Sequence, residues 1–363
     1  MLNIEGKLDN KSKPRPFLLG INFRRTKNMY HTLMRTAVAV ALLIGSVVTA
    51  DAAGPKITDP AKVDSDYALQ GEYTGSLEEN GETIKAGAQI IALGNGEFAI
   101  SYYPGGLPGD GFGRDKSKVV RANSKLENGE VKFSSDKGTA VLSKEGIALF
   151  DPDGNSGPAL KKVNRKSPTL GKKAPKGAVV LFDGSNVENW KNGRLSEDGL
   201  LMEGTTSKDL FQDHHIHLEF RIPYQPLDRG QGRGNSGIYV QGRYELQMLD
   251  SFGLHGAMNE CGGIYSVAET PINMAFPPLT WQTYDIYYTA GRYDDSGKVL
   301  KHPSITCYHN GVKIHDKVQL PGERNTTAAP LKAGAAPGPV FLQNHGCPVR
   351  YRNIWVVESA EEK

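Results

Sequence analysis

The sequence has little cysteine, little net charge and few long runs of helix-forming residues. Three cysteines in 363 residues are too few for a disulfide scaffold. A formal net charge of +3, with aromatic residues spread along the chain rather than interleaved with a basic patch, argues against a nucleic-acid partner. The 42 glycines and 21 prolines instead favour many short strands joined by turns.

The first 52 residues have the pattern of a targeting segment. An apolar run over residues 37–48 follows several basic residues and precedes small residues that offer cleavage after Ala50 or Ala52. Met29 and Met34 are alternative starts, so Met1 is interpreted as an over-extended start. We expect a signal peptide at residues 1–52, a periplasmic or secreted protein, and no membrane span after cleavage. A membrane anchor is the alternative.

The cysteines fit an oxidising compartment but allow at most one intramolecular bridge. Cys307 stands in an apolar alternation and is expected to be a small buried residue. Cys261 and Cys347 both stand in glycine-containing loops, and a disulfide between them is a hypothesis.

The rest of the chain divides into two β-rich segments. Residues 55–160 contain short strand candidates separated by turn dipeptides such as Asn95-Gly96 and Asn128-Gly129, which predict a small antiparallel β domain of unclear role. Residues 161–177 are basic and contain Pro168 and Pro175, as expected of a solvated linker.

Residues 178–358 contain about nine short strand candidates. They include the alternating segment 216–222, a hairpin around Gln241-Gly242, and a hairpin around Asn310-Gly311. Their number and spacing predict an all-β fold with a two-sheet jelly-roll sandwich, preceded by the smaller antiparallel β domain.

The most informative strand runs from Tyr244 to Asp250. Glu245 and Gln247 share one face of a regular strand, while Leu246 faces the core. Asp250 would fall on the opposite face unless a β-bulge returned it to the polar side. The pattern therefore indicates either a cleft with two carboxylates or an ordinary solvent-facing strand that ends in an Asp turn.

The spacing Glu-x-Gln-x-x-Asp resembles the Glu-x-Asp-x-x-Glu strand of family 16 glycoside hydrolases, which have a concanavalin-like sandwich. More specifically, residues 178–358 resemble the 3-keto-disaccharide hydrolase, or 3-keto-glucoside 1,2-lyase/hydratase, domain family. The resemblance lies in Leu181-Phe182-Asp183-Gly184, Gly234-Asn235-Ser236-Gly237-Ile238-Tyr239, Tyr244-Glu245-Leu246-Gln247-Met248-Leu249-Asp250-Ser251 and Leu342-Gln343-Asn344-His345-Gly346.

Two departures from the glycosidase strand argue against double displacement. Gln247 stands where a carboxylate would be, and Asp250 is one methylene shorter than Glu. A retaining glycosidase needs two carboxyl groups about 5–5.5 Å apart.

The resemblance implies instead that a base removes the C2 proton of a 3-keto-sugar, that the C1 substituent is expelled, and that water can then add. Glu245 is the predicted base. Asp250 is a second acid/base or an orienting residue, and His345 is a donor or metal ligand.

Further side chains are candidates for substrate binding. Arg350 and Arg352 alternate on one strand and are expected either to meet the sugar or to balance the charge of Glu219 or Asp250. The complete set of predicted substrate-binding residues is Glu219, Asn235, Gln247, Tyr265, Arg350 and Arg352.

A metal is a separate possibility at the same residues. His217 and Glu219, together with Glu245 and His345, form a conceivable divalent metal set, although no tight ligand spacing is present.

The sequence thus predicts a carbohydrate-active enzyme. A non-catalytic carbohydrate-binding module or a surface adhesion protein is the alternative. A 3-keto substrate also implies an upstream sugar 3-dehydrogenase as a pathway partner.

Overall fold

The computed structural model describes residues 54–79, 82–157 and 159–358. The predicted signal peptide and its cleavage sites lie outside these residues. Residues 51–363 form one compact unit. The described residues contain strands and four short 3-10 helices but no α-helix, which confirms the all-β prediction; none of their helices has the length and apolarity to cross a membrane. The 3-10 helices are η1 (Pro60–Lys62), η2 (Ser65–Ala68), η3 (Lys116–Lys118) and η4 (Gly230–Gly232).

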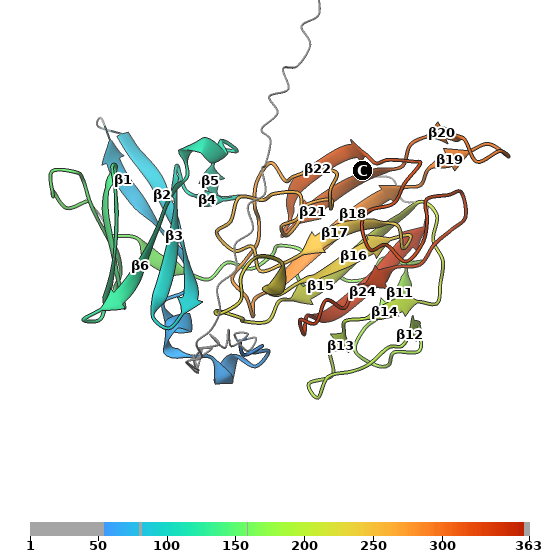
Figure 1. Ribbon diagram of the computed structural model, residues 1–363, viewed down its shortest axis with the longest axis horizontal. Helices are drawn as coiled ribbons and strands as arrows, with labels where there is room; N and C mark the ends of the chain where they lie inside the picture. Colours follow the sequence, from blue (N-terminus) through green and yellow to red (C-terminus); the bar gives the residue numbers. More distant parts are fainter. Residues whose placement is uncertain (1–53, 80–81, 158, 359–363) are drawn as a thin grey trace, which may run out of the picture. The chain divides into compact units, whose positions relative to one another are not determined.

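The first β region is an eight-stranded antiparallel sheet in the order β10-β1-β2-β3-β6-β7-β8-β9 (Figure 1). The turns Asn95-Gly96 and Asn128-Gly129 join its strands with positive φ at both residues, as their hairpin chemistry predicts. A two-stranded ribbon of β4 (Leu107–Pro108) and β5 (Gly111–Phe112) lies beside it. The eight strands are β1 (Gly71–Glu79), β2 (Glu82–Gly94), β3 (Glu97–Pro104), β6 (Val120–Glu127), β7 (Glu130–Ser135), β8 (Gly138–Ser143), β9 (Gly146–Phe150) and β10 (Lys161–Val163).

The second β region is the predicted two-sheet sandwich. Its larger sheet has seven strands in the order β11-β24-β15-β18-β21-β22, with β13 added beside β24 (Figure 1). The turn Asn310-Gly311 joins β21 to β22, as predicted. The strands are β11 (Val179–Phe182), β13 (Leu201–Met202), β15 (His214–Arg221), β18 (Trp281–Thr289), β21 (Ser304–His309), β22 (Val312–Gln319) and β24 (Arg350–Glu358).

The smaller sheet has five strands in the order β12-β14-β23-β16-β17. The predicted hairpin of β16 and β17 turns through Gln241-Gly242, both with positive φ. The strands are β12 (Trp190–Lys191), β14 (Thr205–Ser207), β16 (Ser236–Val240), β17 (Tyr244–Met248) and β23 (Phe341–Leu342). A separate pair, β19 (Arg292–Tyr293) and β20 (Val299–Lys301), extends from the region between β18 and β21.

The core of the sandwich lies between these two sheets. Ile216 and Leu218 of β15 and Leu246 of β17 are fully buried in one apolar cluster. A hydrogen bond of 2.5 Å between Ser236 Oγ and Tyr351 Oη also joins the sheets. Residues that alternate with these core positions therefore face away from the core.

Most residues of the basic segment 161–177 are exposed, but several of them contact the two β regions. Lys161–Val163 form β10, and Arg165 pairs with buried Glu72. Ser167 is buried, and Lys172 forms an ion pair with Asp285 of β18 at 2.9 Å. Arg165 and Lys172 thus have acidic partners on the two β regions, which composition alone does not reveal.

All three cysteines are free and buried. The hypothesis of a Cys261–Cys347 bridge is wrong, because Cys261 Sγ instead lies 3.3 Å from Tyr284 Oη and Cys347 Sγ lies 3.5 Å from Gly232 O. Cys307 occupies the buried position in β21 that its alternation predicts.

Candidate active site

Glu245 and Gln247 lie on the face of β17 that points away from the sandwich core, as strand alternation predicts. The residues that alternate with them, Leu246 and Met248, belong to the apolar core cluster. The outward face is nevertheless covered, since Glu245 is only 2% exposed and Gln247 1% exposed. Part of the cover is the residue 326 region, where Thr326 Oγ1 accepts a hydrogen bond of 2.9 Å from the Glu245 amide. These polar side chains thus lie in a closed environment.

Burial raises the pKa of Glu245 to about 7, and a hydrogen bond from Tyr239 opposes this rise. A carboxyl with a pKa near 7 exchanges protons readily at neutral pH. The pKa of Tyr239 is raised by burial and by the neighbouring carboxyl, so its hydroxyl keeps its proton and remains a donor.

Gly237 creates the space that the Glu245 carboxyl occupies. A methyl group on Gly237 would lie 2.2 Å from Glu245 Oε1, well inside contact distance. Gly237 is on β16, directly beside β17 in the sheet. Any larger residue at this position would displace the carboxyl, so the absence of a side chain at Gly237 is what permits this close approach.

A second polar side chain reaches the same place from β23. Gln343 Nε2 donates to Tyr239 Oη at 3.1 Å, and the Gln343 amide donates to Gly237 O at 2.9 Å. Gln343 Oε1 is buried and has no hydrogen-bond partner among the described residues. It is an acceptor that a donor from a bound molecule can satisfy.

Gln247 begins a second branch of the network. Its Nε2 donates to Gln231 Oε1 at 3.0 Å, and Gln231 Oε1 also accepts from Asn235 Nδ2 at 3.1 Å. Asn235 Oδ1 is another buried acceptor without a partner in the described part of the chain. Tyr265, partly buried, joins through its amide, which donates to Glu245 O at 3.1 Å. The structure therefore brings together predicted residues Glu245, Gln247, Asn235 and Tyr265.

Asp250 lies beyond the end of β17 and is tied to Arg233. Arg233 Nε and Asp250 Oδ2 are 2.6 Å apart, and both side chains are almost fully buried. The Phe252 amide approaches Asp250 Oδ1 at 3.4 Å. No bulge within β17 is needed to place Asp250, because the strand stops at Met248. The contacts of Asp250 are those of an orienting residue.

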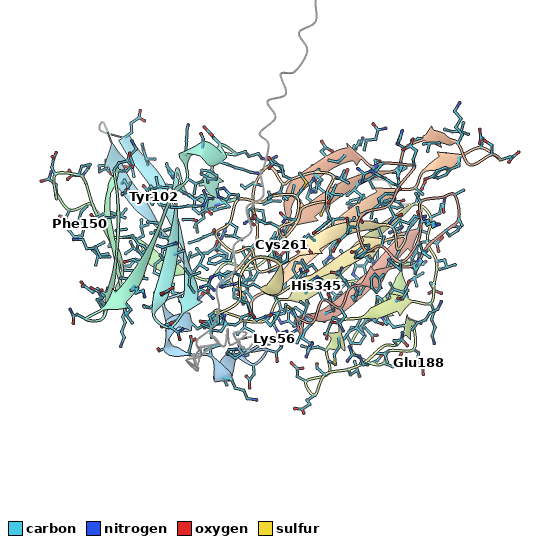
Figure 2. All side chains as sticks on the ribbon, viewed as in Figure 1. Lys56, Tyr102, Phe150, Glu188, Cys261 and His345 are labelled. Carbon is cyan, nitrogen blue, oxygen red and sulfur yellow. The ribbon has the colours of Figure 1, made fainter. Side chains whose placement is uncertain are left out.

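His345 lies on the exposed loop that follows β23 (Figure 2). Its neighbour Gly346 accepts a hydrogen bond from Lys56 Nζ.

Glu219, Arg350 and Arg352 belong to the larger sheet, so they do not share a strand face with Glu245. Arg352 Nε donates to Glu219 Oε2 at 2.7 Å, and Arg350 Nη1 donates to Glu203 Oε2 at 2.9 Å. The charge-balance alternative describes the Arg352–Glu219 pair correctly, whereas Arg350 pairs with Glu203 rather than with Glu219 or Asp250. Arg352 also covers the ring of Trp281 on β18, with its guanidinium carbon 4.0 Å from the ring centre.

The same division separates the conceivable metal ligands. His217 and Glu219 lie on β15 of the larger sheet and Glu245 on β17 of the smaller one. Within the described residues no group of three or more His, Cys, Asp or Glu side chains is arranged to hold a metal ion. His217 lies instead 3.1 Å from Asp285.

Three residues of the cluster, Tyr239, Gln343 and Gln231, were absent from the predicted site. Strand alternation carried a signal for Tyr239, because it shares a face of β16 with Gly237. Gln343 and Gln231 lie outside long strands, so only the folded arrangement reveals them.

Comparison with known proteins gives a family match over the sandwich. A family model described as the 3-keto-alpha-glucoside-1,2-lyase-like domain matches residues 177–357. No curated protein matches the chain.

Similar solved structures include two candidate glycosyl hydrolases of Parabacteroides distasonis. The first is 32% identical, with 51% of this chain and 85% of that chain covered and a TM-score of 0.47. The second is 19% identical, with 51% and 95% covered and a TM-score of 0.38.

Proposed function

This chain belongs, through residues 177–357, to the family of 3-keto-alpha-glucoside-1,2-lyase-like domains, and we propose that it cleaves the glycosidic bond of 3-keto-glycosides by elimination. The family supports a carbohydrate-active enzyme. The observation that supports this chemistry is the buried Glu245 carboxyl, whose pKa of about 7 suits a general base at neutral pH.

The reaction begins with proton abstraction. The C3 carbonyl of the substrate acidifies the C2 hydrogen, and the Glu245 carboxylate takes that proton to leave an enolate. The enolate electrons then form the C1–C2 double bond and restore the C3 carbonyl while the C1–O bond breaks. The expelled oxygen takes a proton and leaves as an alcohol.

Water can then add across the C1–C2 double bond. Its oxygen bonds to C1 and loses one proton to the group that protonated the leaving alcohol. Glu245, after its proton has exchanged with solvent, protonates C2, so the net reaction is hydrolysis. The unpaired Asn235 Oδ1 and Gln343 Oε1 are proposed acceptors for sugar hydroxyl groups. Asp250 is assigned a positioning role through Arg233, and His345 stays a proposed donor to the leaving oxygen.

Glu245→Gln tests the base directly. The amide keeps the shape of the carboxyl but cannot take a proton, so kcat on 3-keto-trehalose should fall by about 100-fold to 10,000-fold. Glu188→Gln makes the same change at an exposed position and should leave kcat unchanged. Normal turnover by Glu245→Gln would remove the base assignment.

Isotope exchange separates elimination from direct displacement. Turnover in D2O should place deuterium at C2 of the sugar product, since that proton is removed and replaced. Cleavage with hydrogen retained at C2 would contradict the mechanism. Tight binding of 3-keto-trehalose without turnover would favour the carbohydrate-binding module instead.

Two further proposals concern the setting of the protein. The basic and apolar N-terminal pattern supports a periplasmic or secreted location. The 3-keto substrate requires a preceding oxidation at C3, which a sugar 3-dehydrogenase would supply.

A further inference from the structure

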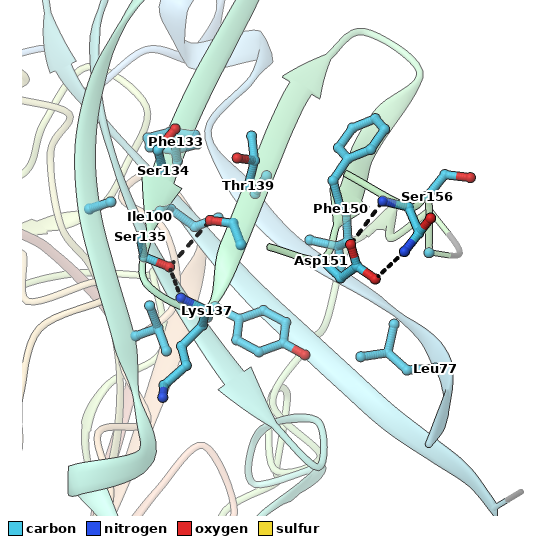
Figure 3. Close-up of a pocket in the computed structure, with 18 of the residues that line it drawn as sticks. Leu77, Ile100, Phe133, Ser134, Ser135, Lys137, Thr139, Phe150, Asp151 and Ser156 are labelled. Carbon is cyan, nitrogen blue, oxygen red and sulfur yellow. Dashed lines mark hydrogen bonds between the residues drawn. The ribbon is translucent and has the colours of Figure 1, made fainter. Parts of the chain in front are cut away.

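The eight-stranded β region contains a cavity of about 530 Å³ that is partly open to solvent and lies outside the residues that match the family (Figure 3). Its walls come from β1, β3 and β6 to β9 and from the turns that follow β7 and β9. This volume lies within the range of about 300–1,000 Å³ that is typical of small-molecule sites.

The sheet around this cavity closes on itself. Ile147 of β9 and Leu160 exchange two backbone hydrogen bonds of 2.9 and 2.8 Å. Leu160 leads directly into β10, which pairs with β1 at the start of the sheet. The region is therefore a closed barrel, and an eight-stranded barrel is wide enough either to fill with its own side chains or to hold one small ligand.

Residue size explains why one part of the interior is hollow. Phe98, Val131 and Leu142 are fully buried inside the barrel and do not line the cavity. Ala122 of β6 and Ala140 of β8 contribute only methyl groups to the cavity wall. Small side chains at these inward positions leave space that larger ones would fill.

The wall is largely apolar, and its remaining lining residues include several uncharged polar side chains and three charged ones. Ile100, Phe133 and Leu149 supply apolar surface, and Phe150 lies at the edge with Thr139 nearby (Figure 3). The uncharged polar lining groups are the side chains of Tyr102, Ser134, Ser135, Thr139, Asn155 and Ser156. Such a wall suits a molecule with an apolar body and a few hydroxyl groups.

Charge at the cavity disfavours an anionic ligand. Lys137 is the one cation among the described lining residues, and its Nζ already lies 3.4 Å from Asp136. Two carboxylates, Glu78 and Asp151, also line the cavity, and each accepts a hydrogen bond of 2.8 Å from a neighbouring residue. A ligand carboxylate would meet two like charges and no unpaired cation.

We propose that the barrel is a binding site for an uncharged aromatic small molecule that carries at least one hydroxyl group. The aromatic body packs between Phe133 and the aliphatic wall, and the hydroxyl group meets the serine and threonine side chains at the edge. This site is separate from Glu245 and does not depend on the proposed reaction.

Fluorescence titration of the full chain with N-phenyl-1-naphthylamine, a neutral aromatic dye, tests the site. The dye should bind with a Kd on the order of micromolar, and 4-phenylphenol should displace it. Ala140→Phe fills the cavity from inside and should raise the Kd at least about tenfold. Lys132→Ala, on the exposed face of the neighbouring β7, should leave the Kd unchanged.

Ala122→Leu provides a second filled cavity if Ala140→Phe does not fold, and circular dichroism verifies the fold of each variant. If neither variant folds, 4-phenylphenol should still raise the thermal midpoint of the wild-type protein. The proposal is overturned if the wild type does not bind the dye. It is also overturned if a correctly folded Ala140→Phe or Ala122→Leu variant binds the dye as tightly as the wild type does. Displacement by dodecanoate but not by 4-phenylphenol would overturn the aromatic ligand class.

Discussion

A buried carboxyl such as Glu245 is stabilised in its neutral form, so it links folding to pH. Its pKa is raised from 4.5 to about 7 in the folded protein, and its contribution to stability is therefore fully present below pH 4.5 and is lost as the pH rises through about 7. The corresponding difference in the free energy of unfolding is about 3 kcal/mol.

We expect Glu245→Gln to remove this dependence. The free energy of unfolding of the wild type minus that of the variant should fall by about 3 kcal/mol between pH 4.5 and pH 8, because the variant has no proton to lose. Urea unfolding at a series of pH values measures this difference. A flat difference curve would show that Glu245 titrates normally.

Segment 167–173 covers the outer face of the larger sheet through Asp285. Asp285 Oδ1 lies 2.9 Å from Lys172 Nζ of this segment. It also lies 3.1 Å from His215 Nε2 and 3.1 Å from His217 Nδ1 of β15. Although burial alone would raise the pKa of Asp285, hydrogen bonds from these three groups lower it below its usual range. Asp285 thus stabilises the folded state above its ordinary pKa of 3.8, and this contribution is lost in acid.

Asp285→Asn should lower the free energy of unfolding at pH 7 by about 3 kcal/mol, because it removes the charge that three buried or half-buried groups share. The difference from wild type should shrink as the pH falls below about 4. Lys172→Met removes only a half-exposed partner and should cost less than about 1 kcal/mol. Equal losses from both substitutions would contradict the central role of Asp285.

Local patterns predicted strands and strand faces, but they did not predict the partners across the sheets. The alternation at β17 correctly placed Glu245 and Gln247 on one face, and Asn-Gly dipeptides marked real turns. Local patterns do not show that Arg352 and Glu245 lie on different sheets, because sheet order depends on pairings between strands more than 100 residues apart in the sequence. The same distance hid the pairing of Lys172 with Asp285, 113 residues away, whereas the Arg233–Asp250 pair spans only 17 residues and depends on how the loops around β16 and β17 fold.

Several contacts join the barrel and the sandwich within the compact unit of residues 51–363. Ser101 Oγ donates to Gly253 O at 2.7 Å, and Ile57 pairs with Tyr224 through two backbone hydrogen bonds. Arg233 Nη2 donates to Ala92 O of β2 at 3.2 Å while its Nε holds Asp250. We therefore expect the two regions to unfold together.

Tryptophan fluorescence can test this, since Trp190, Trp281 and Trp355 all lie in the sandwich. Denaturant transitions followed by fluorescence and by far-ultraviolet circular dichroism should coincide. Arg233→Met leaves Asp250 buried without its partner. The free energy of unfolding obtained from each of the two transitions should therefore fall by about 3 kcal/mol. Exposed Arg324→Met is the control, and separate wild-type transitions would contradict the expectation.

The buried thiols make the molecule suitable for labelling at a single chosen position. Burial raises the pKa of the Cys261 thiol to about 11 and also raises the pKa of the Cys307 thiol. Cys347 is buried as well, with only 2% of its surface exposed. The thiolate is the form that attacks maleimide reagents, so all three buried cysteines should react slowly in the folded protein. Lys132→Cys, at an exposed position of β7, would then carry one dye on the barrel, and ligand entry could be followed optically without removing any native cysteine.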